Sequence, residues 1–320
     1  MSVCKICKNE HNNKSHIARE MMFGSRDQFE YIECAHCGCL QIKEIPNNLS
    51  KYYPTNYYSF QKSYYLKDNL LKSFFRHQRA RYGIYGKNII GLLLSKFYGM
   101  PNYYGWLKKV TIRFDSEILE VGCGVGYLLL DLQKDGFSNL TGIDPFIDDH
   151  IFYDNGVKIL NKEIYEMEQA FDFIMLLHSL EHMPQPLSIL KEIYRLLKPN
   201  QYALIRIPVA SSFAWRKYGV KWVQLDAPRH LFLHTIKSIQ ILADEVGFQI
   251  VDIVFDSTEF QFWGSEQYLL DIALMDNHSY LKDPQKSIFS QKQIEFFKTK
   301  AIELNKNNDG DSVSIYLYKN

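Results

Sequence analysis

Four cysteines near the N-terminus are spaced as two C-x-x-C pairs. Cys4 and Cys7 form the first pair, Cys34 and Cys37 form the second, and 26 residues separate the pairs. Each pair presents two thiolates from one tight turn, and two facing turns make a tetrahedral four-sulfur cage that suits Zn²⁺. Such a cage has no open coordination position for water, so the spacing predicts a structural ion and not a catalytic one.

A disulfide framework is the alternative for the same cysteines. The chain starts "MSVCKICKNE", without a basic segment, an apolar run and a small-residue cleavage site, which gives no support for export to an oxidising compartment. We therefore expect a cytoplasmic protein with a bound zinc ion. His36 and Cys39 are the alternative ligands, should one of the four cysteines not bind the ion.

A second set of metal-binding residue types consists of His178, Glu181 and His182, which match the H-x-x-E-H signature of one class of zinc peptidases. That chemistry needs a helix that puts both histidines on a single face. Here the run "FDFIMLL" predicts a strand that ends at the motif, and Pro184 and Pro186 prevent a long helix through it. The sequence therefore argues against a peptidase metal site.

The stretch "EILEVGCGVGYLLL" predicts a ligand-binding turn between a strand and a helix. Glu120 closes the strand, and Gly122, Gly124 and Gly126 let the backbone turn sharply and lie against a ligand. A dinucleotide fingerprint would put the third glycine one residue later, where Tyr127 stands. The preceding acid suits a ligand that carries an ammonium group in place of a pyrophosphate.

Asp144 ends the next predicted strand, "NLTGID", 18 residues after Gly126. A carboxylate only accepts hydrogen bonds, so at this place it can take both hydroxyls of a ribose.

Apolar runs and helical patterns alternate from Ser116 onward, which predicts a parallel sheet covered by helices on both faces. The segment from about 259 to 310 breaks the rhythm, and the chain ends in one more strand. The predicted strands are "EILEVG", "NLTGID", "VKIL", "FDFIMLL", "YALIRIPV", "QIVDIVF" and "SVSIYLYK".

These features resemble the class I S-adenosylmethionine-dependent methyltransferases over roughly residues 111–255. The matching stretches are "EILEVGCGVG", "LTGIDP", "FDFIMLLHSLEHMPQPLSILKEIYRLLKPN" and "ALIRIP". The resemblance implies a Rossmann-like, seven-stranded, mostly parallel sheet with a reversed last strand. It also implies that Glu120 and the three glycines line the methionine end of the cofactor, that Asp144 binds the ribose and that His178 neighbours the cofactor. A Rossmann-like sheet that binds another nucleotide, or none, is the alternative.

Three parts are expected along the chain. Residues 1–60 form a zinc-ribbon-like module, 61–110 a helical connector and 111–320 the methyltransferase domain with its insertion at about 259–310. The connector's most apolar run, "IIGLLLSKF", is far shorter than the roughly 20 residues of a membrane-spanning helix. We expect it to be a buried helix, with peripheral contact to a membrane surface as the alternative.

Methyl transfer to a hydroxyl or an acidic carbon needs a base, for which His182, His230 and Glu181 are the candidates. Support of the cofactor loop is the alternative role for His182. The candidate substrate-binding residues are Asp226, Arg229, Trp263 and Glu266. For Arg229, the alternative is a structural ion pair with a sheet-edge carboxylate. For Trp263, the alternative is a place in a simple packing helix.

The combination of four cysteines, the "YYPTNYYSF" linker, "PRHLFLHT" and an aromatic insertion is similar to bacterial methyltransferases of surface-polysaccharide and deoxysugar pathways. That resemblance implies a nucleotide-linked sugar or glycan precursor as the acceptor. An RNA methyltransferase is disfavoured by the net charge of +1, from 37 basic and 36 acidic residues, and by the lack of an N-P-P-Y-type tetrapeptide after "FDFIMLL". A non-catalytic zinc- and cofactor-binding interaction protein is the third class.

Overall fold

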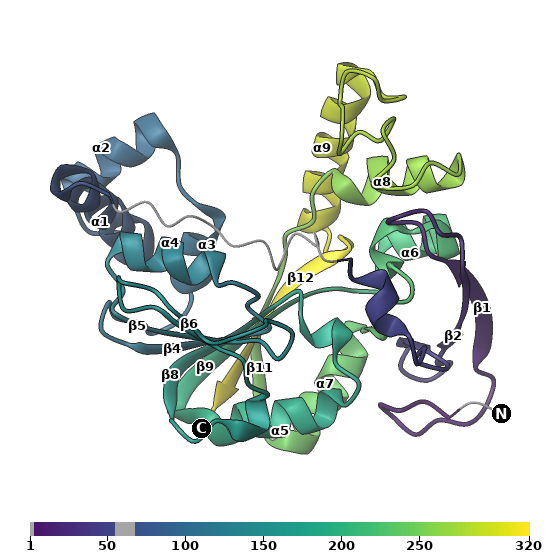
Figure 1. The fold of residues 1–320 in the computed structure, drawn as a ribbon, viewed down its shortest axis with the longest axis horizontal. Helices are drawn as coiled ribbons and strands as arrows, with labels where there is room; N and C mark the ends of the chain where they lie inside the picture. Colours follow the sequence, from purple (N-terminus) through teal and green to yellow (C-terminus); the bar gives the residue numbers. More distant parts are fainter. Residues whose placement is uncertain (1–2, 55–67) are drawn as a thin grey trace. The chain divides into compact units, whose positions relative to one another are not determined.

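The computed structural model describes residues 3–54 and 68–320 (Figure 1). Their contacts divide the chain into two compact units. The first unit comprises Met1–Pro54, Leu180–Ser188 and Arg206–Ile315, and the second comprises Thr55–Ser179, Ile189–Ile205 and Tyr316–Asn320. The predicted boundary at residue 60 lies outside the described residues.

The second unit is built on parallel strands. Strands β5 (Asn139–Ile143) and β8 (Phe171–Leu177) flank β4 (Glu117–Val121), and both pair with it in parallel. Because the chain goes to one side of β4 and later to the other, the carboxyl end of β4 is a topological switch point, where open α/β sheets bind ligands. The predicted glycine turn follows β4 at this point.

The hydrogen-bonded ladder has eight strands, in the order β11-β12-β9-β8-β4-β5-β7-β6. All seven predicted strands are present, which confirms a Rossmann-like, mostly parallel α/β sheet. The eighth, β6 (Ile151–Phe152), is a two-residue strand antiparallel to β7 and too short to leave a periodic pattern. The remaining bounds are β7 (Lys158–Leu160), β9 (Leu197–Pro208), β11 (Gln249–Phe255) and β12 (Ser312–Lys319).

Glycines and a side-chain cap mark the ends of two helices. Helix α4 (Tyr127–Asp135) ends at Gly136, which has a left-handed φ of 111°. Helix α7 (Ile236–Val246) begins at Thr235, whose side chain accepts a hydrogen bond from the Ser238 amide, and it ends at Gly247. The others are α1 (Leu70–Tyr85), α2 (Ile89–Tyr98), α3 (Asn102–Leu107), α5 (Pro186–Leu196), α6 (Phe213–Tyr218), α8 (Phe260–Leu269) and α9 (Gln291–Lys306).

The connector is helical as predicted, but its apolar helix is not buried. Helices α1 and α2 lie side by side (Figure 1), and Gly91 is the buried residue of α2. The buried-helix expectation is therefore wrong, because α2 contacts α1 along one narrow side. In the described part of the chain, no helix is long and apolar enough to cross a membrane.

The first unit contains a small sheet with the order β1-β2-β3-β10. Strand β1 (Lys14–Arg19) is antiparallel to β2 (Gln28–Glu33), which is antiparallel to β3 (Leu40–Ile42). The fourth strand, β10 (Phe232–Leu233), comes from the far end of the sequence and pairs with β3. The cysteine-containing segment therefore shares one sheet with residues that follow His230.

We predict that Gly91→Ala destabilises the helical connector. A Cβ at Gly91 would lie 2.1 Å from the backbone oxygen of Gln78 in α1, so the helices must separate. We expect a loss of about 1–3 kcal/mol in the free energy of unfolding, measured by urea denaturation.

Gly105→Ala is the matched control. It lies in α3 with nothing within 4 Å of the added Cβ, and we expect a gain of about 0.5 kcal/mol from helix propensity. Equal effects of the two substitutions would contradict close packing of α1 against α2.

Candidate functional site

The turn after β4 is made of three glycines in the left-handed region. Gly122, Gly124 and Gly126 have φ values of 74°, 54° and 78°. A Cβ at Gly122 would lie 2.5 Å from the Cβ of Ser179, and one at Gly126 would lie 2.4 Å from Cδ1 of Ile159. Glycine is therefore required here both for the backbone conformation and for the close approach of neighbours.

Glu120 is a buried acid at the base of this turn. Its residue is 6% exposed, and within residues 3–54 and 68–320 its Oε2 atom has no hydrogen-bond partner. Burial, and next the charge of Asp144, raise the pKa of Glu120 from its ordinary value of 4.5 to about 8. A cationic group placed beside this carboxyl would relieve that penalty, so the site suits a ligand with an ammonium group.

Asp144 is fixed at the end of β5 by two backbone amides. Its Oδ2 accepts a hydrogen bond of 2.8 Å from the Gly124 amide, and its Oδ1 accepts one of 2.9 Å from the Phe146 amide. A carboxylate only accepts hydrogen bonds, which is the chemistry that a ligand hydroxyl requires. The structure thus places Glu120, the three glycines and Asp144 together, as the sequence predicts.

His178 follows β8 as an exposed residue with a left-handed φ of 52°. The next residue, Ser179, donates a hydrogen bond of 2.8 Å from Oγ to the Val121 carbonyl at the end of β4. Ser179 also borders Gly122, a contact that the sequence did not predict, since a serine after a strand carries no specific pattern.

The H-x-x-E-H stretch does not form the helix of a zinc peptidase. A single 3₁₀ turn (Leu180–His182) lies between β8 and α5, so the two histidines of the motif have no common helical face. In its place, the first unit brings Glu181 and His182 to His230, with their ligand-type atoms within 4.8 Å of one another. Two histidines and a buried carboxylate can hold a divalent cation or take up a proton.

Both imidazoles of this cluster are oriented by backbone carbonyls. Nδ1 of His182 lies 2.9 Å from the Arg229 oxygen, and Nδ1 of His230 lies 2.8 Å from the Gln224 oxygen. A carbonyl only accepts, so each Nδ1 carries the proton and each Nε2 keeps its lone pair. His182 is partly exposed, whereas His230 is 7% exposed.

Burial, and next the charge of His182, lower the pKa of His230 to about 4. His230 is therefore neutral at pH 7. Carboxylate oxygens of Glu181 and Asp226 each lie 4.0 Å from its Nε2. They would stabilise a positive charge that develops in this cluster.

Arg229 is fully buried and pairs with two carboxylates. Its Nη2 donates to Asp226 Oδ1 at 2.6 Å and to Glu20 Oε1 at 3.0 Å, and its Nη1 donates to the Tyr52 carbonyl at 3.2 Å. Burial works against the charge of Asp226, but Arg229 holds the pKa of that carboxyl below its ordinary value. The predicted role of Asp226 and Arg229 in substrate binding stays a prediction, because in this structure they bind each other.

The two predicted substrate-binding residues of the insertion, Trp263 and Glu266, also contact neighbouring side chains. Trp263 is 7% exposed, with its ring centroid 4.8 Å from that of Phe260 and 5.2 Å from that of Tyr280. Glu266 accepts hydrogen bonds from Tyr218 and Lys217 at 2.7 and 3.0 Å. Their role as a sugar platform is likewise untested.

Tyr53 is a neighbour of His182 that the sequence analysis did not single out. Its hydroxyl lies 3.2 Å from Nδ1 of His182. It lies within the aromatic "KYYPTNYYSF" run, but composition does not tell which tyrosine of such a run reaches a distant histidine.

The four predicted cysteines form one cluster of free thiols. The sulfur atoms of Cys4 and Cys37 lie 3.7 Å apart, those of Cys7 and Cys34 lie 3.4 Å apart, and all four fall within 4.8 Å of one another. Two tight turns present them, since the Lys8 amide donates to the Cys4 carbonyl and the Gly38 amide donates to the Cys34 carbonyl. This donor set fits a tetrahedral zinc ion.

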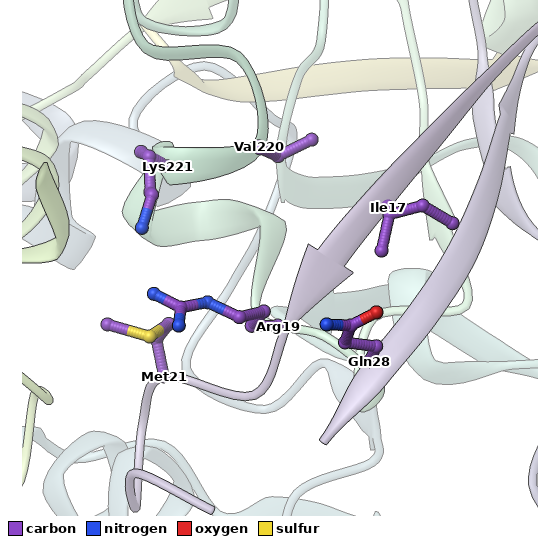
Figure 2. Close-up of a pocket in the computed structure, with 6 residues that line it drawn as sticks. All are labelled: Ile17, Arg19, Met21, Gln28, Val220 and Lys221. Atoms are coloured by element: carbon purple, nitrogen blue, oxygen red, sulfur yellow. The ribbon is translucent and has the colours of Figure 1, made fainter. Parts of the chain in front are cut away.

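A hollow of about 200 Å³ lies on the first unit between β1, β2 and the segment after α6. Figure 2 shows the charged ends of Arg19 and Lys221 directed toward one another at this hollow. Burial, and next the charge of Arg19, lower the pKa of Lys221 below its ordinary value. Arg19 pairs with Asp271, and Lys221 adds a second positive charge, so the hollow suits an anionic group.

A family model described as "Methyltransferase domain" matches residues 66–253, which is more than half of the 320-residue chain. Among curated proteins, two proteins named ubiquinone biosynthesis O-methyltransferase, from Pseudomonas aeruginosa and Pseudomonas putida, are similar. Each is 28% identical over 173 residues, which cover 48% of this chain and 73% of the relative.

Remote similarity to solved structures is also present. A S-adenosylmethionine-dependent methyltransferase from Archaeoglobus fulgidus is 18% identical with a TM-score of 0.43, and it covers 72% of this chain and 100% of its own. The cyclopropane synthase MmaA2 from Mycobacterium tuberculosis is 12% identical with a TM-score of 0.44, and it covers 78% of this chain and 100% of its own.

We predict that Glu120→Gln stabilises the ligand-free protein above pH 5. The folded state holds the Glu120 proton up to about pH 8, whereas the unfolded chain loses it near pH 4.5, so wild-type stability falls as the pH rises through this window. The variant lacks this loss, and we expect a gain of about 3 kcal/mol at pH 7 and none at pH 4 in urea denaturation.

The same substitution should weaken S-adenosylmethionine binding about tenfold in calorimetry, because the ammonium group loses its charged partner. Glu117→Gln, on the same strand, is the control that should change neither quantity. A variant that binds the cofactor as tightly as wild type would remove Glu120 from the cofactor site.

Proposed function

Because the chain belongs to the methyltransferase domain family, we propose that it moves the methyl group of S-adenosylmethionine to a hydroxyl of a nucleotide-linked sugar or glycan precursor. The observation that carries the proposal is the histidine pair of the first unit, in which His182 is oriented for proton uptake and partly exposed. The activity would serve surface polysaccharide biosynthesis, in the cytoplasm, where the free cysteines stay reduced.

Glu120, the three glycines and Asp144 would hold S-adenosylmethionine. Glu120 would face the ammonium group, the glycine backbone would lie against the methionine part, and Asp144 would take the ribose hydroxyls. The sulfonium group of the cofactor supplies an electrophilic methyl group. The protein's remaining tasks are to orient the acceptor and to remove its proton.

His182 is the residue that we assign as the base. Its Nδ1 proton is donated to the Arg229 carbonyl, so Nε2 can accept the proton of the acceptor hydroxyl as the oxygen gains the methyl group. His230 and Glu181 are the supporting residues, because a neutral imidazole and a buried carboxylate favour the positive charge that forms on His182. Two residues along the chain separate His182 from Ser179, which borders the glycine turn.

A hydroxyl acceptor agrees with the similarity to the two Pseudomonas proteins, which are named O-methyltransferases. The positive hollow at Arg19 and Lys221 supports an acceptor with an anionic part, such as the diphosphate of a nucleotide-linked sugar. Because the similar proteins are named for ubiquinone biosynthesis, a ubiquinone precursor is the second candidate acceptor.

The proposal includes a structural zinc ion at the four cysteines. The ion would join the turn before β1 to the turn after β2. The N-terminal segment that contains these turns packs against the loop that carries His230. Strand β3 pairs with β10, the Tyr31 hydroxyl donates to the His230 carbonyl at 2.7 Å, and the Thr235 hydroxyl donates to the Cys37 carbonyl at 2.5 Å.

Incubation of the protein with methyl-labelled cofactor and a panel of acceptors, read by mass spectrometry, tests the proposal. We expect label on the sugar of a nucleotide-linked sugar. Label on a ubiquinone precursor would favour the second acceptor class, and label on RNA with salt-sensitive binding would overturn both. If methyl transfer depended on added Mg²⁺ or Mn²⁺, Glu181, His182 and His230 would be assigned as metal ligands, and His182 would be excluded as the base.

We predict that His182→Asn lowers kcat by about 100-fold or more with cofactor affinity unchanged. The Asn amide can still donate to the Arg229 carbonyl, so the loop keeps its contact while the proton acceptor is lost. His278→Asn is the control, because the His278 side chain is 75% exposed and pairs locally with Asp276. Full activity of His182→Asn on the identified acceptor would assign the base to another residue.

We predict that Cys34→Ser removes the bound metal and lowers both stability and methyl transfer. Three remaining thiolates hold zinc poorly, and the segment that supports His230 loses its cross-link. The zinc content, measured by plasma mass spectrometry, should fall from about one ion per chain to nearly none. Cys39→Ala is the control, since Cys39 lies outside the cluster and its thiol faces the Leu40 carbonyl at 3.4 Å; loss of zinc there would revise the ligand set.

A further inference from the structure

Helix α2 exposes an apolar stripe that the proposed function does not use. Ile89, Leu93 and Phe97 are spaced four residues apart, which puts them on one face of the helix. Their exposed fractions are 76%, 53% and 83%. The opposite side, at Gly91, packs against Gln78 of α1. The stripe therefore lies on the side of α2 that faces away from α1.

Neighbouring positions of the second unit also expose large apolar side chains. On α1, Leu70 and Leu71 are 92% and 65% exposed, and Tyr98 at the end of α2 and Met100 after it are 75% and 48% exposed. Exposed apolar side chains gathered in one short segment favour a contact site.

The charge of the same segment favours an anionic contact partner. Residues 69–114 contain nine Lys or Arg and no Asp or Glu, in a chain whose net charge is only +1. Three of the nine, Lys72, Arg76 and Arg113, form ion pairs with acids outside this range. Lys87 precedes α2 and Lys96 lies next to Phe97, and both are exposed. An apolar stripe flanked by basic residues, without acids, has the composition of helices that lie in the interface of anionic membranes.

We propose that α2 docks this protein onto the surface of an anionic lipid bilayer. The stripe of Ile89, Leu93 and Phe97 would enter the boundary between headgroups and acyl chains, while Lys87 and Lys96 would contact lipid phosphates. With ten residues, α2 is about 15 Å long, so it lies in the interface and does not span the bilayer. The proposal does not depend on which acceptor is methylated.

The same observations argue against a second copy of the chain as the occupant. A symmetric contact through α2 would bring Lys87 and Lys96 of one copy against those of the other. No acid within residues 69–114 could offset that repulsion. An anionic surface has the complementary charge.

Vesicle flotation with the full chain tests the proposal. We expect binding to vesicles of phosphatidylglycerol mixed with phosphatidylcholine, weaker binding at high salt, and little binding to phosphatidylcholine alone. Phe97→Glu should weaken binding to the mixed vesicles by about tenfold or more, because it removes the most exposed ring and adds a repelled charge. Lys96→Glu should weaken binding severalfold through charge alone.

Ile302→Glu is the matched control, because Ile302 is 56% exposed on α9, outside the basic segment, and should float as wild type does. Circular dichroism and cofactor binding should be unchanged in all three variants, which separates loss of docking from loss of folding. The proposal is overturned if wild type ignores anionic vesicles, or if Phe97→Glu floats equally well. It is also overturned if light scattering finds a dimer that Phe97→Glu dissociates while vesicles bind neither protein.

Discussion

The buried guanidinium of Arg229 is the interaction on which the first unit depends. It joins Glu20 and the Tyr52 carbonyl, from the N-terminal segment, to Asp226 in the loop that carries His230. A buried charge is tolerated only when its donors are satisfied, so the two segments must fold onto one another. The backbone oxygen of Arg229 also fixes His182. One residue therefore couples the packing of the cysteine-bearing segment to the orientation of the proposed base.

The two proposed sites treat buried charge in opposite ways. Around Arg229, carboxylates and guanidinium neutralise one another, which makes a rigid support. At Glu120, burial raises the pKa of the carboxyl. The free energy of unfolding at neutral pH is therefore lower than it would be with a neutral side chain at this position. Such local destabilisation is expected where a ligand completes the electrostatics. The support is complete without a ligand, whereas the cofactor site is not.

Local patterns predicted much of the fold. Strand and helix positions from residue 116 onward, the glycine turn, Asp144 at the end of β5 and the cysteine cluster all follow from periodicity or short spacing. The exclusion of a peptidase site also came from local rules, because a strand and two prolines deny the helix. Exposure of α2 was not predictable, since an apolar run has the same pattern in a core helix as at an interface.

The sequence by itself determined the elements and the methyltransferase family, and it predicted residues that would bind S-adenosylmethionine, because each depends on neighbours close along the chain. Only the tertiary structure decided which distant residues meet. The pairing of β3 with β10, the joining of Glu20 to Arg229 and the approach of His230 to Glu181 and His182 each span well over 40 residues. No periodicity encodes such contacts, since they arise from burial and from the need to pair every buried charge. For that reason His182 could be named from the sequence, while its orientation by Arg229 could not.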